Sequence, residues 1–208
     1  MDALHIDFFD KKTGVVTNSR LMELKILSSC SKLCMASGGT AGTYDQAIRT
    51  LSIPVPKNST DTKDIELKKG MDAVKTKLEL AHKKFAPNID QNWMEKHDYW
   101  MMLVSEVVEQ LVDGIEIRSK TESETEQGKT IYDYDLEFLF DGRSWVFCTT
   151  DHNDFSGDVR QGAYYIDGIE NKAVSSTAAW VASLFGSVTM FKGLCESHER
   201  HASNTDNE

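Results

Sequence analysis

The stretch that decides the fold is Thr130–Asp151, TIYDYDLEFLFDGRSWVFCTTD. In its first half, apolar side chains occupy every second position from Tyr132 to Phe140. The positions between them carry three acids, Asp133, Asp135 and Glu137. A period of two predicts a β-strand with one packed face and one acidic face. The Asp141-Gly142 turn leads into a second aromatic run, so the stretch predicts an antiparallel hairpin.

Two segments before this hairpin show helical periodicity, with apolar residues that alternate between steps of four and three. In the first they are Leu67, Met71, Val74, Leu78, Ala81 and Phe85, and in the second Trp93, His97, Trp100, Val104, Val107 and Leu111. The joint at Ala86–Asn88 is short, which predicts that the two helices pack antiparallel. A further strand, predicted at Ile115–Ser119, extends the hairpin into a meander of three or more strands.

A final helix is predicted from about Ile169 to about Arg200. Its segment Ala173–Phe191 holds no charged residue over 19 positions. We do not interpret it as a membrane span, because many of its residues are Ser, Thr or Gly and no second span accompanies it. Small residues at Ala179, Ser183 and Ser187 suit close helix contact, so the helix is expected either at the centre of the subunit or at a homodimer interface.

Together these elements predict an α+β fold in which an antiparallel β-meander packs with an antiparallel helical hairpin and a long C-terminal helix. The length suits a single α+β domain over residues 1–200. The prolines near residues 53–61 suggest a possible linker. The polar end, residues 201–208, is expected to be a disordered tail.

Composition narrows the classes of function. A formal net charge of −10 disfavours nucleic acid as a partner, because phosphate backbones attract proteins with a surplus of Lys and Arg. Four cysteines, Cys30, Cys34, Cys148 and Cys195, lie in apolar segments, as free thiols do in reducing compartments. No export signal is visible at the start. We therefore expect a cytoplasmic protein that needs no cofactor and no membrane.

The loop that follows the hairpin, Asp151–Asp158, gathers oxygen ligands and a histidine. Its potential metal ligands are Asp151, Asp154 and Asp158. It does not match a calcium loop, because Phe155 holds the fifth position and the glycine comes seventh. With Asp133 and Asp135 on the strand and His152 and Asp154 in the loop, a metal-assisted hydrolase is nevertheless one hypothesis, and these four are its candidate catalytic residues.

Two histidines lie in the predicted helical hairpin. Glu79 and His82 have the spacing of a di-metal half-motif, but the heptad register directs both away from the seam between the helices, so no di-metal site is predicted. His97 falls at a seam position between two tryptophans. It is expected to be a buried histidine with a hydrogen-bond partner that fixes the register of the helices.

No catalytic motif stands out, which favours a non-enzymatic binding or regulatory protein. An acidic module of this kind can inhibit or cap another protein, as immunity, anti-defence or accessory proteins do, and its charge can steer it onto a basic site. The metal-assisted hydrolase is the alternative. A protein partner is expected under the first hypothesis, and thermal melting with EDTA or added metal separates the two.

Overall fold

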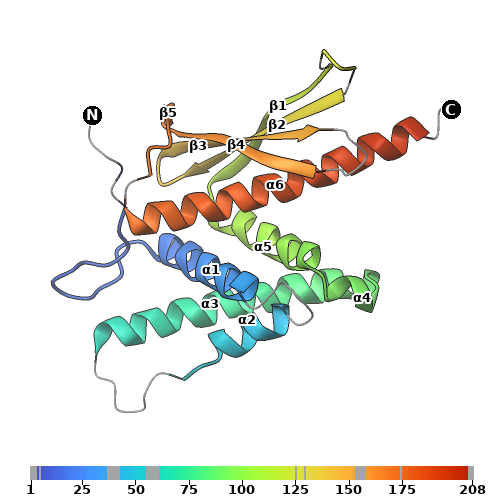
Figure 1. Ribbon diagram of the computed structural model, residues 1–208. Coiled ribbons are helices and arrows are strands. Elements are labelled where there is room, and N and C mark those ends of the chain that lie inside the picture. Colours follow the sequence, from blue (N-terminus) through green and yellow to red (C-terminus); the bar gives the residue numbers. More distant parts are fainter. Residues whose placement is uncertain are drawn as a thin grey trace. The chain divides into compact units, whose positions relative to one another are not determined.

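The computed structural model describes residues 4, 6–36, 43–54, 61–124, 126–128, 130–152, 158–173 and 175–205. These residues form six α-helices, one 3₁₀ turn and a five-stranded antiparallel sheet (Figure 1). The predicted α+β class is confirmed, including the helical hairpin and the long C-terminal helix.

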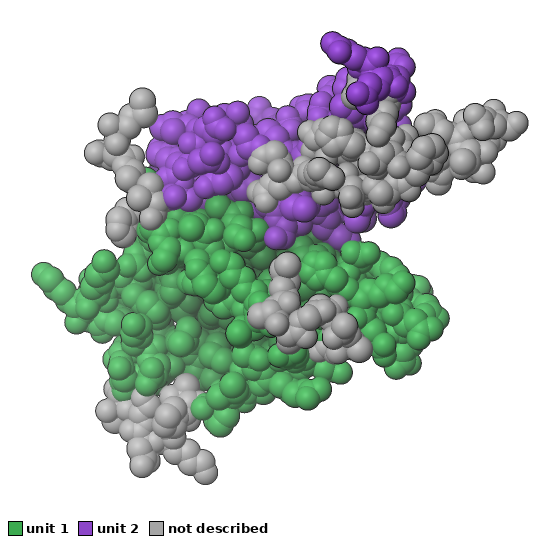
Figure 2. Space-filling model, viewed as in Figure 1, with its two compact units in different colours: residues 1–111, 174–184 green, residues 112–173, 185–208 purple. Residues whose placement is uncertain are grey.

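The chain divides into two compact units, shown in Figure 2. Unit 1 comprises residues 1–111 and 174–184, and unit 2 comprises residues 112–173 and 185–208. Residues 55–60 of the expected linker and residues 206–208 of the expected tail lie outside the described residues. The single domain therefore stays a prediction.

Unit 1 is helical. Its α-helices are α1 (Ser19–Ala36), α2 (Thr43–Leu51), α3 (Thr62–Phe85), α4 (Gln91–Met94), α5 (His97–Leu111) and the first part of α6 (Ser176–Thr205). The heptad residues in the middle of α3 and α5 are buried, as the spacing predicts: Val74, Leu78 and Ala81 on α3, and Trp100, Val104 and Val107 on α5. Gly70 brings α3 close to α1, because a Cβ there would lie 2.5 Å from the Met22 methyl carbon.

Two local details of unit 1 differ from the expectation. The second helix of the hairpin was expected to be continuous from Trp93, but α4 ends at Met94 and α5 begins at His97. Asp90 caps α4 by accepting a 2.8 Å hydrogen bond from the backbone amide of Asn92, which fixes a separate helical turn before α5. Leu67, expected in the seam, is 36% exposed.

Unit 2 contains the sheet. Its strands are β1 (Gly114–Glu124), β2 (Thr130–Phe140), β3 (Arg143–His152), β4 (Asp158–Ile166) and β5 (Ile169–Glu170), and they pair in this order. The ring of Phe185 on α6 stacks on Phe138 with 4.4 Å between centroids. Phe140, Trp145 and Phe147 meet the same ring edge-on. The packed parity of the hairpin is therefore the core of this unit, as predicted.

The five-stranded sheet agrees with the predicted meander of three or more strands, but α6 begins later than expected. Residues from Ile169 were expected to be helical, but Asp167 and Gly168 both have positive φ, at 52° and 73°, and form the turn that returns the chain as β5. Strand β1 is longer than the predicted Ile115–Ser119, because Thr121–Glu124 also pair with the start of β2. Helix α6 then runs from Ser176 to Thr205.

One helix of the described chain is long and apolar enough to cross a membrane. It is Ser176–Glu199 of α6, with a mean hydropathy of 1.3 in its most apolar part, half of which is buried inside the protein. Core helices of soluble proteins share these properties. The expected absence of a membrane span therefore stays a prediction.

Candidate functional site

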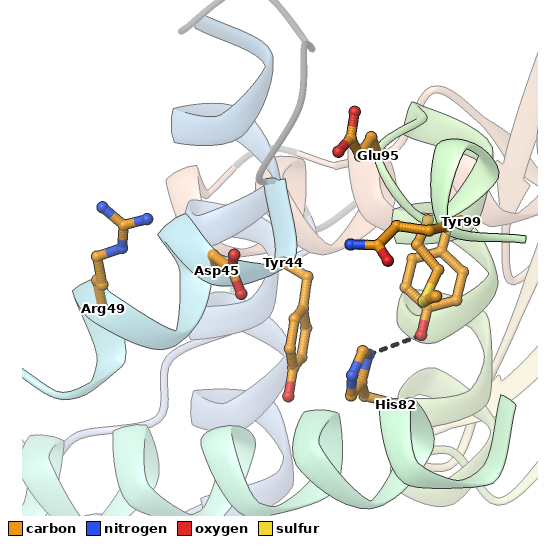
Figure 3. Close-up of a pocket in the computed structure, with 8 residues that line it drawn as sticks. Tyr44, Asp45, Arg49, His82, Glu95 and Tyr99 are labelled. Atoms are coloured by element: carbon orange, nitrogen blue, oxygen red, sulfur yellow. Dashed lines mark hydrogen bonds between the residues drawn. The ribbon is translucent and has the colours of Figure 1, made fainter. Parts of the chain in front are cut away.

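The candidate functional site is a hollow of about 530 Å³ in unit 1, which we call the His82 pocket (Figure 3). It is lined by Tyr44, Asp45, Arg49, His82, Gln91, Met94, Glu95 and Tyr99. A volume in this range is typical of small-molecule sites.

The local sequence explains why these side chains meet. Helix α2 buries Thr43, Ala47 and Leu51 at four-residue spacing, so Tyr44 and Asp45 lie to the side of that buried stripe. His82 lies in the last turn of α3, outside its buried stripe. The interruption between α4 and α5 adds Glu95 to the pocket lining. Four helices, α2, α3, α4 and α5, thus contribute to one pocket.

An aromatic arrangement holds His82 in place. Its ring stacks on Tyr44, with 4.2 Å between centroids and 10° between planes. Its Nδ1 atom and the Tyr99 hydroxyl share a hydrogen bond of 2.7 Å (Figure 3). The ring of Trp93 packs edge-on against Tyr99, with 5.8 Å between the ring centroids. The histidine ring is therefore fixed in orientation by stacking and by a hydrogen bond.

Burial and nearby charges act on the two tyrosines of the pocket. Burial raises the pKa of Tyr44 to about 12, with further contributions from Glu79, Tyr99 and Asp45. Burial also raises the pKa of Tyr99. Both hydroxyls are therefore neutral near pH 7, and the carboxylates that oppose ionisation of Tyr44 would favour a cation at the same place.

Two carboxylates at the pocket lack a cationic partner within the described chain. Neither Asp45 nor Glu95 lies within ion-pair distance of a described lysine or arginine. Arg49 also lines the pocket, but Figure 3 shows its guanidinium directed away from Tyr44 and His82. The centre of the pocket is therefore aromatic, and its free charges are mostly negative.

The acidic face of the sheet, formed by Asp133, Asp135 and Glu137, is organised differently. Arg118 Nη2 lies 2.5 Å from Glu137 Oε2, and the Ser144 hydroxyl donates to the same carboxylate. The Arg118 hydrogen bond, helped by Ser144, holds the pKa of Glu137 below its usual value although burial opposes this. The Ser119 hydroxyl donates a 2.9 Å hydrogen bond to Asp135.

Glu137 corrects one expectation, because this side chain was assigned to the solvated face and is only 2% exposed. The reason lies in the neighbouring strand, where the register between β1 and β2 shifts between Ile117 and Ser119. The extra residue is Arg118, whose guanidinium pairs with the carboxylate.

The predicted metal site falls largely on residues whose side chains are not described. The strand register pairs His152 with Ile131 on one side and with Asp158 on the other, and pairs Asp151 with Tyr132 and Val159. Asp154 lies outside the described residues. The side chains that the structure does describe form no group of three potential ligands. The metal-assisted hydrolase therefore stays a prediction.

The environments of the two histidines, His82 and His97, differ from those expected. His97 is half-buried at the first residue of α5, one turn before the well-buried Trp100. His82 is indeed turned away from the seam between α3 and α5, but α2 packs there and supplies Tyr44. Among the pocket residues, the sequence singled out only His82, through its spacing from Glu79.

The residues expected at a homodimer interface are accessible on α6. Ala179 and Ser183 are exposed, and Ser187 is half-buried. The helix is therefore not covered on every side, and the homodimer stays a prediction.

Comparison of the chain with family models, with curated proteins and with solved structures found no significant match.

Proposed function

We propose that this chain is a non-enzymatic, acidic, cytoplasmic protein that binds and regulates another protein through a basic segment of that partner. The His82 pocket would receive a lysine or arginine side chain. The observation that carries the proposal is the combination in one pocket of stacked aromatic walls with two carboxylates, Asp45 and Glu95, that have no cationic partner in the described part of the chain.

The chemistry of the pocket suits a cation. A cationic head can lie against the face of Tyr44 that does not stack on His82, because the face of an aromatic ring attracts positive charge. The charges of Glu79 and Asp45, which add to the effect of burial on the pKa of Tyr44, would favour the bound cation. The carboxylates at the rim would add Coulombic attraction to it.

The charge of the whole chain supports the same partner. With a net charge of −10, the protein attracts a basic surface at distances of about 10 Å at 0.1 M salt, and this speeds association. Binding is therefore expected to weaken as ionic strength rises, mainly through a slower association rate.

The test is fluorescence anisotropy with a labelled oligoarginine peptide, and with oligoglutamate as the negative probe. Glu95→Gln and Asp45→Asn should each weaken oligoarginine binding by about two- to fivefold. Tyr44→Leu should weaken it by about two- to thirtyfold, through loss of the cation–aromatic contact. Glu116→Gln is the matched control, because it removes one exposed negative charge on β1, outside the pocket.

The control separates site binding from attraction to the overall charge. If Glu116→Gln weakens binding as much as Glu95→Gln does, the pocket is not the site. Failure of oligoarginine to bind at millimolar concentration and low salt would overturn the proposal as a whole.

A further inference from the structure

A second hollow in unit 1, which we call the apolar groove, has a different character from the His82 pocket. It has a volume of about 410 Å³ and is lined mainly by apolar side chains. Six of these are Phe8, Phe9, Ile26, Leu33, Leu67 and Met71. Leu33 is 53% exposed and Leu67 is 36% exposed, so apolar surface remains in contact with water here. Such a surface gains free energy when an apolar group covers it.

Lysines accompany the apolar lining. Lys25 and Lys63 are part of the groove itself. The Lys25 ammonium lies 3.3 Å from the centre of the Trp180 ring, and the Lys32 ammonium lies 3.7 Å from the centre of the same ring. Lys63 lies 5.5 Å from the ring centre of Phe9. Two lysines therefore contact the same indole ring, and one of them, Lys25, also lines the groove.

These lysines are not compensated by acids. No carboxylate of the described chain lies within ion-pair distance of Lys25, Lys32 or Lys63, although the protein has ten more negative than positive charges. Burial, and then the nearby charge of Lys32, lower the pKa of Lys25. An anion near the Lys25 ammonium would offset part of the repulsion between the two positive charges.

We propose that the apolar groove binds a single-chain amphipathic anion, such as a long-chain carboxylate. Its hydrocarbon chain lies against Phe8, Phe9 and Leu67, and its anionic head lies near Lys25. This inference does not rest on the proposed function, because groove and pocket share no lining residue and call for ligands of opposite charge.

The size of the hollow favours a single molecule over a membrane surface. Its volume is within the range of small-molecule sites, and its walls come from the N-terminal segment, α1, α2 and α3, so it is a hollow with several walls. Each methylene transferred from water into such a groove should strengthen binding about fourfold. Affinity should therefore rise with chain length until the groove is filled.

The experiment is isothermal titration calorimetry of the full chain with saturated carboxylates of increasing length, each kept below its micelle-forming concentration. We expect affinity to rise about fourfold per methylene and then to level off. The primary alcohol of the same length should bind more weakly by about two- to fivefold, because it has no charge to place near the lysines. An affinity that does not depend on chain length, or an alcohol that binds as well as the carboxylate, would overturn the proposal.

Matched variants locate the site. Lys25→Gln should weaken carboxylate binding by about two- to fivefold, whereas Lys83→Gln, which changes an exposed lysine on α3 outside the groove, should leave it unchanged. Leu33→Gln should weaken binding, and Leu80→Gln should not, because Leu80 is 59% exposed and lies outside the groove. Both leucines are exposed, so neither change is expected to disturb folding.

Vesicles distinguish the free amphiphile from a lipid surface. Sedimentation with anionic phospholipid vesicles, without any binding of the monomeric carboxylate, would overturn the proposal in favour of a membrane contact. Equal effects of Leu33→Gln and Leu80→Gln would overturn it in favour of general adsorption to apolar surface.

Discussion

The acidic face of the sheet and the His82 pocket both collect carboxylates, but they hold them in opposite ways. On the sheet, Glu137 is paired with Arg118 and Ser144, and Asp135 accepts from Ser119. In the pocket, Asp45 and Glu95 have no cation of the described chain within ion-pair distance.

This difference distinguishes carboxylates that stabilise the fold from carboxylates that can bind a ligand. A carboxylate that is buried and paired contributes to the native fold, and its removal costs stability. A carboxylate that is exposed at a pocket and unpaired contributes little to stability, and its charge is left for a partner. The comparison therefore predicts effects on stability in the sheet and effects on binding in the pocket.

The largest expected effect concerns Cys148, which lies opposite Asp135 in the sheet. Burial raises the pKa of its thiol to about 12, and Asp135 and Asp133 add to the shift. At pH 8 the native thiol should react with iodoacetamide roughly a thousandfold more slowly than an ordinary cysteine with a pKa of 9.0. Mass spectrometry of the digested protein measures the modified fraction at each cysteine.

The same experiment contains its own reference, because unfolding in urea should restore ordinary reactivity. Asp135→Asn should increase the native rate only modestly, since burial is the largest cause of the shift. A Cys148 that is modified equally fast in native and unfolded protein would show that the sheet does not protect it. The described cysteines, Cys30, Cys148 and Cys195, are free thiols, so no reductant is needed.

The second prediction tests how strongly the buried face of α5, next to the pocket, stabilises the fold. Trp100 follows the pocket residue Tyr99 on α5 and is only 1% exposed. Trp100→Ala should lower the free energy of unfolding by about 3 kcal/mol or more, because it leaves a cavity in the core. Urea denaturation measures the loss. The exposed residue Leu80 supplies the control, and Leu80→Ala should change stability by no more than about 0.5 kcal/mol.

A Trp100→Ala loss below about 0.5 kcal/mol would contradict the buried hairpin. A milder change tests one further detail, since the indole Nε1 of Trp100 is buried without a hydrogen-bond partner in the described structure. Trp100→Phe removes this unpaired group and should therefore cost much less than Trp100→Ala.

The third prediction tests the paired acid of the sheet. Glu137→Gln should destabilise the protein by about 1–3 kcal/mol near neutral pH, through loss of charged hydrogen bonds at a buried site. Because folding lowers the pKa of Glu137, its ionised form stabilises the native state. This contribution is complete above the ordinary pKa of 4.5 and is lost as the pH falls through the lower native value.

The difference in stability between the natural protein and Glu137→Gln should accordingly shrink in acid and stay constant above about pH 6. Denaturation measured across this pH range gives the profile. Glu116→Gln is the control, because Glu116 lies opposite Glu137 on β1 but is exposed. A difference that grows as the pH falls would reverse the assigned role of Glu137.

Local periodicity explains what the sequence could predict. The alternation from Tyr132 to Phe140 identifies the packed face of β2, and the heptad spacing identifies the buried faces of α3 and α5. Both patterns repeat within one element, so they need no knowledge of neighbouring elements. The fold class follows from them.

The pocket could not be predicted in this way, because its parts belong to different elements. His82 has no special position on α3 until α2 brings Tyr44 against it, and no periodic pattern encodes that contact. Likewise, the pairing of Glu137 depends on the register shift that places Arg118 beside it. Contacts between different elements therefore decide which carboxylates are paired, and these contacts differ between the sheet and the pocket.

The smallest effect on folding is expected on α6, at the predicted homodimer interface. Ser183 is exposed in the subunit, so Ser183→Glu should change the free energy of unfolding by no more than about 0.5 kcal/mol. In a symmetric dimer, the two glutamates, one from each subunit, would lie close together near the twofold axis and should oppose association. A glutamate at the neighbouring position Ala179 or Ser187 should have the same effect. Light scattering at tens of micromolar should therefore show a dimer for the natural chain and a folded monomer for Ser183→Glu. Ser52→Glu, an exposed serine just after α2, should leave the dimer intact. A natural chain that is monomeric at this concentration would remove the interface and leave the exposed side of α6 as plain solvated surface.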